Sequence, residues 1–294
     1  MSFMYNPFPF DDPRPVNRPE LSEKTVKSII SGGNQNVVKK FVATLADRAA
    51  KEGVVVALDG YTTANWTVFV NLIARECCLL GLGFEAIDAN AATLKSGKEI
   101  DAIIDPLLIW DTKIDPTLLY GKVYKGGYQG LMDEARTEAF KKAVPASRQA
   151  GKISVVYGYG SLIPELRELY DVKVFFDLTP MKSMLRIRRG EYSNLGKERP
   201  GIINRTIRRC YYCDFECAVR NRHELGENNV PDWYVLDNDP QNLQLMPFGT
   251  FADICAQLVK YPFRAKPCYL EGVWGGSYMK KLRNLPDNMR NAAW

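Results

Sequence analysis

Short runs of β-branched and other apolar residues alternate along the chain with longer segments in which apolar residues recur every three or four positions. A short continuous apolar run is typical of a strand that is covered on both faces. The pattern predicts about five strands, at residues 54–58, 84–87, 153–157, 172–178 and 233–236.

Segments with helical periodicity separate these runs. They predict helices within 20–52, 66–80, 133–144 and 164–170, from Pro180 onward, and near 250–260. This alternation is typical of an α/β fold with a parallel sheet of about five strands and helices on both faces. Ligands of such folds bind beyond the carboxyl ends of the strands, where we expect Asp59, Asp88 and Asp237 to gather.

Composition divides the chain further. Residues 1–19 are rich in Pro, Asp and Asn and predict an extended arm, whereas 20–260 predict the α/β domain. Within that domain, 105–132 predict an insertion over the sheet and about 186–230 a basic, lid-like segment. The tail, 261–294, is rich in Pro and Gly and predicts irregular structure.

The counts of histidine and cysteine restrict the chemistry. A single histidine, His223, leaves no cluster for a zinc hydrolase and no Ser-His-Asp triad. Seven cysteines without a secretory signal predict reduced thiols and a cytoplasmic protein. No apolar run reaches the ~18–20 residues of a membrane span. The net charge of +5, without an aromatic-interleaved basic motif, predicts no nucleic-acid partner.

Cys210, Cys213 and Cys217, with His223 beyond them, have a spacing that invites comparison with a zinc site. On a helix these cysteines share one face. Zinc sites usually combine two separated ligand pairs, so we predict a packed helix face and no metal.

The turn after the first strand is the candidate phosphate site. A phosphate-binding loop, G-x-x-x-x-G-K-[ST], cradles phosphate with its amides, neutralises it with its lysine and holds magnesium with its hydroxyl. Residues 60–67 keep Gly60 and Thr67 but have Asn65 in place of the second glycine and Trp66 in place of the lysine. The turn is therefore either an anion site without its cation or a packed connection. The candidate phosphate ligands in it are Gly60, Thr62, Thr63, Asn65 and Thr67.

Beyond the fourth strand, a helix that carries the string 186–189, Arg-Ile-Arg-Arg, resembles the lid entry of the uridine-kinase and nucleotide-kinase group. The resemblance covers about 54–240. It implies that Arg186, Arg188 and Arg189 contact the phosphates of a nucleotide or other small phosphorylated ligand, with ATP and magnesium as cofactors of an active member. A solvated basic helix face is the alternative.

The third strand departs from that group, because Tyr157-Gly158 stands where uridine kinases have Glu-Gly. Asp59 and Asp88 remain as candidate catalytic or metal-binding carboxylates. Buried aspartates at strand ends also commonly cap neighbouring backbone.

The string Gly-Val-Trp-Gly-Gly at 272–276 resembles the opening segment of class I mannose-6-phosphate isomerases, where it leads into a cupin barrel. The resemblance implies that the chain corresponds to the kinase-like N-terminal region of bacterial isomerase-like proteins, with a C-terminal cupin domain as a partner. Isomerase activity is not expected from this chain alone, because the family binds zinc through barrel residues that it does not contain.

Three functions follow from these observations. The first is a kinase-fold domain with a degenerate phosphate loop that binds a nucleotide or sugar phosphate as a non-catalytic or regulatory module. The second is an active kinase in which a displaced cation, one of Lys95, Lys98, Lys122 and Lys125, replaces the missing lysine. The third is a purely structural or assembly domain.

Overall fold

The computed structural model describes residues 19–116, 120–261 and 284. The chain divides into one unit that spans Lys24–Phe251 and a second that joins its two ends, Met1–Glu23 and Ala252–Trp294. Of the second unit, residues 19–23, 252–261 and 284 are described, and they include the start of α1 and the end of α10. The isomerase-like string at 272–276 and residues 1–18 of the predicted arm lie outside the described residues.

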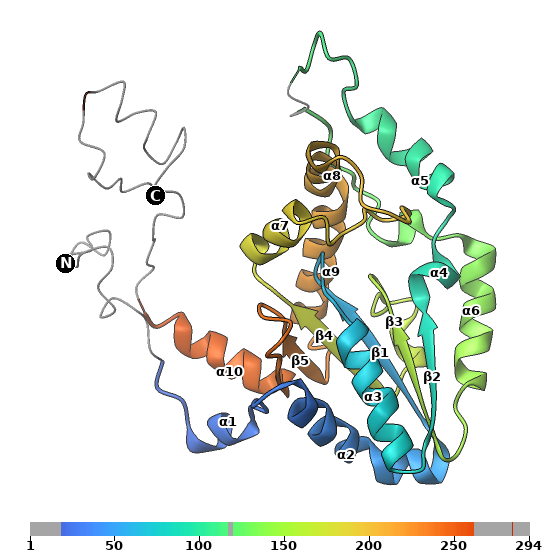
Figure 1. Ribbon diagram of the computed structural model, residues 1–294, viewed down its shortest axis with the longest axis vertical. Coiled ribbons are helices and arrows are strands. Elements are labelled where there is room, and N and C mark those ends of the chain that lie inside the picture. Colours follow the sequence, from blue (N-terminus) through green and yellow to red (C-terminus); the bar gives the residue numbers. More distant parts are fainter. Residues whose placement is uncertain (1–18, 117–119, 262–283, 285–294) are drawn as a thin grey trace. The chain divides into compact units, whose positions relative to one another are not determined.

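Helices and strands alternate along the larger unit as the hydrophobic pattern predicts (Figure 1). The helices are α1 (Glu23–Ser28), α2 (Asn34–Glu52), α3 (Thr67–Leu79), α4 (Ala89–Thr93), α5 (Gly97–Ile104), α6 (Glu134–Ala146), α7 (Pro180–Arg188), α8 (Ile203–Arg209), α9 (Phe215–Glu227) and α10 (Phe248–Leu258). The strands are β1 (Val54–Gly60), β2 (Gly83–Asp88), β3 (Lys152–Tyr157), β4 (Val172–Asp177), β5 (Trp233–Leu236) and β6 (Gln244–Pro247).

The sheet has the strand order β2-β3-β1-β4-β5-β6. The first five strands in this order are parallel, and β6 pairs with β5 in the antiparallel direction. The predicted α/β fold with a mostly parallel sheet is therefore confirmed. The prediction of about five strands missed β6, which has four residues and ends at Pro247. Leu245 in β6 exchanges two backbone hydrogen bonds with Ile30, and these fix its position.

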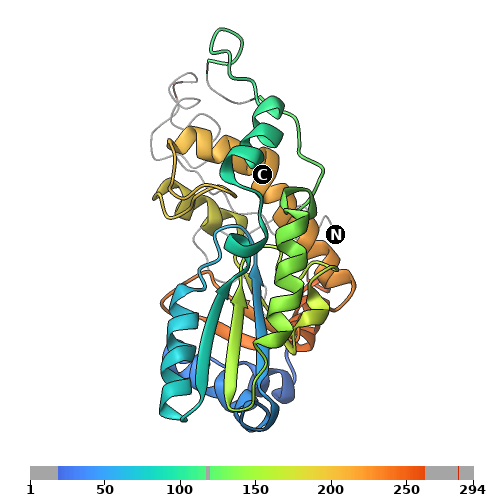
Figure 2. The same ribbon diagram turned by 90° about the vertical axis from the view of Figure 1, so that its right-hand side faces the viewer.

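Helices cover both faces of the sheet. Alternate residues of β1 (Val54, Val56 and Leu58) share one buried cluster with Phe41 of α2 and Phe69 of α3. Strand geometry places such alternate side chains on one face. Figure 2 shows α3, in cyan, and α6, in green, on opposite sides of the strands. No helix of the described part of the chain has the length and apolar character to cross a membrane.

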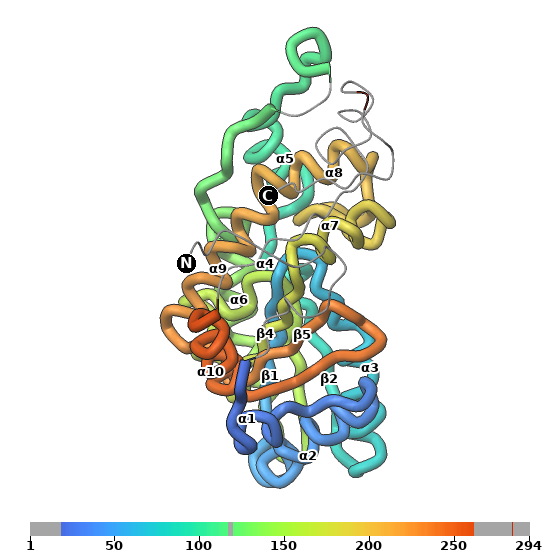
Figure 3. The backbone as a smooth tube through the Cα atoms, turned by 90° about the vertical axis from the view of Figure 1, so that its left-hand side faces the viewer, coloured from blue at the N-terminus to red at the C-terminus, as the bar shows by residue number. Residues whose placement is uncertain are grey.

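The connections beyond the carboxyl ends of β2, β3 and β4 carry most of the irregular structure. Helices α5, α7 and α8 lie at this end of the sheet (Figures 1 and 3). The helix predicted at 164–170 is reduced to a single 3₁₀ turn, Arg167–Leu169. The turn between β1 and α3 points into the same region, so the fold places it where ligands of parallel sheets bind.

Candidate functional site: the turn 60–67 and a neighbouring pocket

The turn that joins β1 to α3 is compact and buried. The Tyr61 amide donates to the carbonyl of Phe176, and the Ala64 amide donates back to the carbonyl of Tyr61, each at 2.9 Å. Thr63 adopts a left-handed φ of 74°. A Cβ on Gly60 would lie 2.6 Å from Ala64 Cβ and 2.9 Å from the Phe176 carbonyl oxygen, so close packing requires glycine there.

The backbone amides of this turn donate to oxygens of the protein itself. The Thr63 amide donates to the Tyr159 hydroxyl at 3.1 Å, and the Asn65 amide donates to Asp237 Oδ2 at 3.0 Å. The Thr67 amide donates to the Asn65 side chain at 3.1 Å. In a phosphate loop such amides face phosphate oxygens. Here, amides that could cradle a phosphate already have partners.

Arg186, a predicted phosphate ligand, is buried and forms an ion pair with Asp237. Its Nη1 donates to Asp237 Oδ2 at 2.8 Å and to the Thr63 carbonyl at 2.8 Å, and its Nη2 donates to Asp237 Oδ1 at 2.9 Å. The fork of the guanidinium matches the carboxylate, as is typical of Arg–Asp pairs. The Asp237 carboxylate thus receives a loop amide and an arginine, the two kinds of donor that a bound phosphate would receive.

The other two predicted lid arginines do not enter this cluster. Arg188 is exposed at the end of α7. Arg189 forms an exposed ion pair with Glu191, in which Nε and Oε1 are 2.5 Å apart. Of the three arginines taken from the resemblance, the structure brings only Arg186 to the turn.

Trp66, which aligns with the lysine of a phosphate-binding loop, packs in a cluster of aromatic side chains. Its ring lies 4.8 Å from the ring of Tyr159 and 6.4 Å from that of Tyr157. Its side chain is buried, and Nε1 has no hydrogen-bond partner in the part of the chain that the structure describes. Tyr157 is itself the residue that stands in place of the glutamate of uridine kinases, so the two departures from the kinase pattern contact each other.

Asp59, a predicted catalytic carboxylate, is fully buried and has four hydrogen-bond donors. These are the amides of Gly60, Gly160 and Leu162 and the side-chain amide of Asn221. Burial raises the pKa of Asp59 to about 6, although the donors act in the opposite direction. Asp59 connects the ends of β1 and β3 to α9, which is the geometry of a structural junction.

The remaining predicted residues make local contacts. Asp88 caps α4 by accepting a hydrogen bond from the Ala91 amide at 2.9 Å. The Thr62 hydroxyl donates to the Asp214 carbonyl, and the Thr63 hydroxyl is buried without a partner among residues 19–116 and 120–261. Thr67 is exposed at the start of α3.

The cationic and sulfur-containing side chains also make internal contacts. Lys95 donates to the carbonyls of Gly130 and Met132. Arg208 stacks 4.4 Å from the centre of the Trp110 ring. Cys210, Cys213 and Cys217 are buried, and the described residues contain no group of three or more side chains arranged to hold a metal.

Sequence reasoning missed Tyr159 and the role of Asp237. Asp237 follows a predicted strand, which places it at the correct edge of the sheet but does not identify Arg186 as its partner. Tyr159 lies between two glycines of left-handed φ, Gly158 and Gly160, and this is the only local signal of a sharp turn there. Its role depends on the tertiary approach of β3 to the 60–67 turn.

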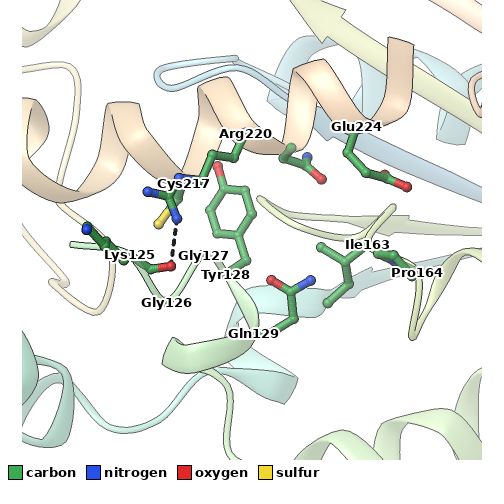
Figure 4. Close-up of a pocket in the computed structure, with 11 residues that line it drawn as sticks. Lys125, Gly126, Gly127, Tyr128, Gln129, Ile163, Pro164, Cys217, Arg220 and Glu224 are labelled. Carbon is green, nitrogen blue, oxygen red and sulfur yellow. Dashed lines mark hydrogen bonds between the residues drawn. The ribbon is translucent and has the colours of Figure 1, made fainter. Parts of the chain in front are cut away.

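An open pocket of about 260 Å³ lies near this junction. It is bounded by the segment 125–129, by Ile163 and Pro164, and by one face of α9 that includes Arg220 and Glu224 (Figure 4). Asn221, which donates to Asp59, also lines it.

The chain is similar in fold to three solved kinases. A proposed fructose transport system kinase from Silicibacter sp. TM1040 has a TM-score of 0.43 and 14% identity over 65% of this chain and 94% of its own. A proposed uridine kinase from Bacillus stearothermophilus has a TM-score of 0.29 and 13% identity over 52% of this chain and 84% of its own. Shikimate kinase from Bacteroides thetaiotaomicron has a TM-score of 0.26 and 16% identity over 59% of this chain and 98% of its own.

At these levels of identity and TM-score, the three structures carry no argument about activity. No curated protein matches the chain. Residues 38–260 match the family described as a domain of unknown function, DUF8485. Because that match covers more than half of the 294 residues, the chain belongs to the DUF8485 family.

Proposed function

We propose that this chain is a kinase-fold module that binds a small phosphorylated ligand, a nucleotide or a sugar phosphate, without transferring its phosphoryl group. The observation that carries the proposal is that backbone amides of the turn 60–67 already donate to side chains of the protein itself. The Asn65 amide and Arg186 donate to Asp237, and the Thr63 amide donates to Tyr159.

Phosphoryl transfer requires positively charged groups that neutralise the transferred phosphate. In this chain Trp66 occupies the position of the usual lysine, and Arg186 is neutralised by Asp237. A phosphate that entered the turn would have to break a buried ion pair, which typically costs about 3–5 kcal/mol when one partner is lost. The geometry therefore favours ligand binding outside the turn.

Three wider proposals accompany this one. The module is regulatory and acts with a C-terminal cupin domain of a sugar-phosphate isomerase, a partner suggested by the sequence at 272–276. ATP and magnesium are not cofactors of turnover. The protein is cytoplasmic, which agrees with the free thiols of Cys77, Cys78, Cys210, Cys213 and Cys217.

A turnover assay tests the proposal. The purified chain is incubated with magnesium and ATP, and with uridine, mannose or fructose as the acceptor, and the consumption of ATP is followed. We expect no consumption above the rate without protein. Phosphorylation of any acceptor that is lost in a Thr67→Ala variant would establish the active kinase instead.

A further inference from the structure

The pocket beside α9 has a cationic end. Lys125 is exposed and forms no ion pair within the described part of the chain. Arg220 Nη1 donates to the Lys125 carbonyl at 2.6 Å, which holds the guanidinium over the segment 125–129. Figure 4 shows Lys125 and the guanidinium of Arg220 at the same end of the pocket. Two positive charges there favour an anion.

Backbone amides add to this end. Gly127 has a left-handed φ of 61°, and the amides of Gly126, Gly127 and Tyr128 form no hydrogen bond with another described residue. Successive amides in such a turn form a concavity that binds anions. Lysine, arginine and free amides are the usual donors to a phosphate group.

The opposite end of the pocket carries acceptors. Glu224 lies one turn of α9 beyond Arg220, about 6 Å along the helix axis. Its Oε1 accepts from Arg167 at 2.7 Å, whereas its Oε2 is buried and has no hydrogen-bond partner among the described residues. Asn221 donates its amide to Asp59, which leaves its carbonyl oxygen for the pocket. Acceptors without donors are the counterparts of ligand hydroxyl groups.

From these two ends we infer that the pocket binds a phosphate monoester of a hydroxylated sugar. The phosphate lies against Lys125, Arg220 and the Gly126-Gly127 amides, and the hydroxyl groups face Asn221 and Glu224. The volume of about 260 Å³ is just below the roughly 300–1,000 Å³ that is usual for ligand pockets, so it suits a hexose phosphate better than a nucleotide.

This inference rests on the proposed function, because it assumes that the ligand binds outside the turn 60–67. Binding is measured by calorimetric titration of the full chain with fructose 6-phosphate, uridine 5′-monophosphate, fructose and inorganic phosphate. We expect fructose 6-phosphate to bind, and fructose and inorganic phosphate each to bind at least ten-fold more weakly. Tighter binding of the uridine ester would support the site with a nucleotide as its ligand.

Variants locate the site. Lys125→Gln should weaken binding of fructose 6-phosphate about ten-fold, because a hydrogen bond to a charged group is lost. Lys39→Gln removes an exposed lysine of α2, outside the pocket, and should leave binding unchanged. Arg220→Lys keeps the positive charge but loses the planar pair of guanidinium donors. It should weaken binding even when circular dichroism shows that the variant is folded.

Two results would overturn the inference: no binding of either ester, or binding that Lys125→Gln and Arg220→Lys leave unchanged. Either result removes the pocket assignment. Binding that both variants leave unchanged, together with an absence of ATP turnover, leaves the proposed non-catalytic binding function standing, because the ester then binds elsewhere on the chain. No binding of either ester also removes these two esters as ligands of the proposed module. Turnover of ATP removes the proposed function whatever the titration shows.

Discussion

At the scale of single residues, the turn 60–67 is closed by a carboxylate of the protein. Asp237 accepts from the Asn65 amide and from Arg186, and it is itself completely buried. A carboxylate and a phosphate oxygen accept the same kinds of hydrogen bond. Arg186 is therefore paired with an internal anion, and the Arg186–Asp237 pair is neutral without a ligand.

The Arg186–Asp237 pair should be important for stability. Arg186→Ala leaves the Asp237 carboxylate buried and uncompensated, so we expect the free energy of unfolding to fall by about 3–5 kcal/mol. Arg188→Ala removes an exposed neighbour on the same helix and should change it by less than about 0.5 kcal/mol. Urea unfolding of both variants measures the difference. Equal effects would mean that Arg186 is free to serve a ligand.

Asp59 should make stability depend on pH in a characteristic direction. Its pKa is about 6 in the folded protein, above the value of about 4 expected when unfolded, so the folded state binds the proton more tightly. The resulting stabilisation is present below pH 4 and is lost as the pH rises through 6.

The comparison is made with Asp59→Asn, which does not titrate. Relative to this variant, the wild-type chain should lose up to about 3 kcal/mol of unfolding free energy between pH 4 and pH 7. Urea unfolding at four pH values measures the trend. A wild-type chain that gains unfolding free energy relative to Asp59→Asn as the pH rises would show that the four donors outweigh burial.

At the scale of elements, the predicted strands and the missed strand differ in how strongly their own residues favour a strand. The β1, β3 and β4 sequences are apolar enough to predict buried strands by themselves. The four residues of β6 become a strand because β5 and Ile30 pair with them. The same holds for the site: Gly60 and Thr67 are visible in the sequence, whereas the approach of Tyr159 and Asp237 depends on tertiary packing.

The connections at the amino end of the sheet should also be sensitive to substitution. Gly53 joins α2 to β1 with a φ of 80°, and a Cβ there would lie 2.2 Å from the Gln149 carbonyl oxygen. Gly81 has a φ of 69°, but no atom of another described residue lies within 4 Å of such a Cβ. We expect Gly81→Ala to cost about 1–2 kcal/mol from backbone strain alone.

Gly53→Ala should cost more than about 3 kcal/mol, because a clash with backbone adds to the same strain. Thermal and urea unfolding of the two variants provide the measurement. A similar cost for both would show that the junction between 53 and 149 can move apart.

At the scale of the whole molecule, the α/β fold and the contacts of the turn 60–67 carry different information. A fold does not determine a function, which depends on the groups at the site. The sheet places the turn 60–67 at the usual ligand edge. Three contacts close it, from Tyr159 after β3, Arg186 of α7 and Asp237 after β5. The pocket beside α9 remains open within the described part of the chain.

The closed turn is tested most directly by hydrogen exchange of the peptide that covers residues 60–67, followed by mass spectrometry with and without ATP and magnesium. Amides that donate to Tyr159 and Asp237 exchange slowly, because exchange requires these hydrogen bonds to open. We expect slow exchange in the free protein and no change with the nucleotide. Rapid exchange in the free protein that slows when ATP and magnesium are added would show an open phosphate site and would contradict the account.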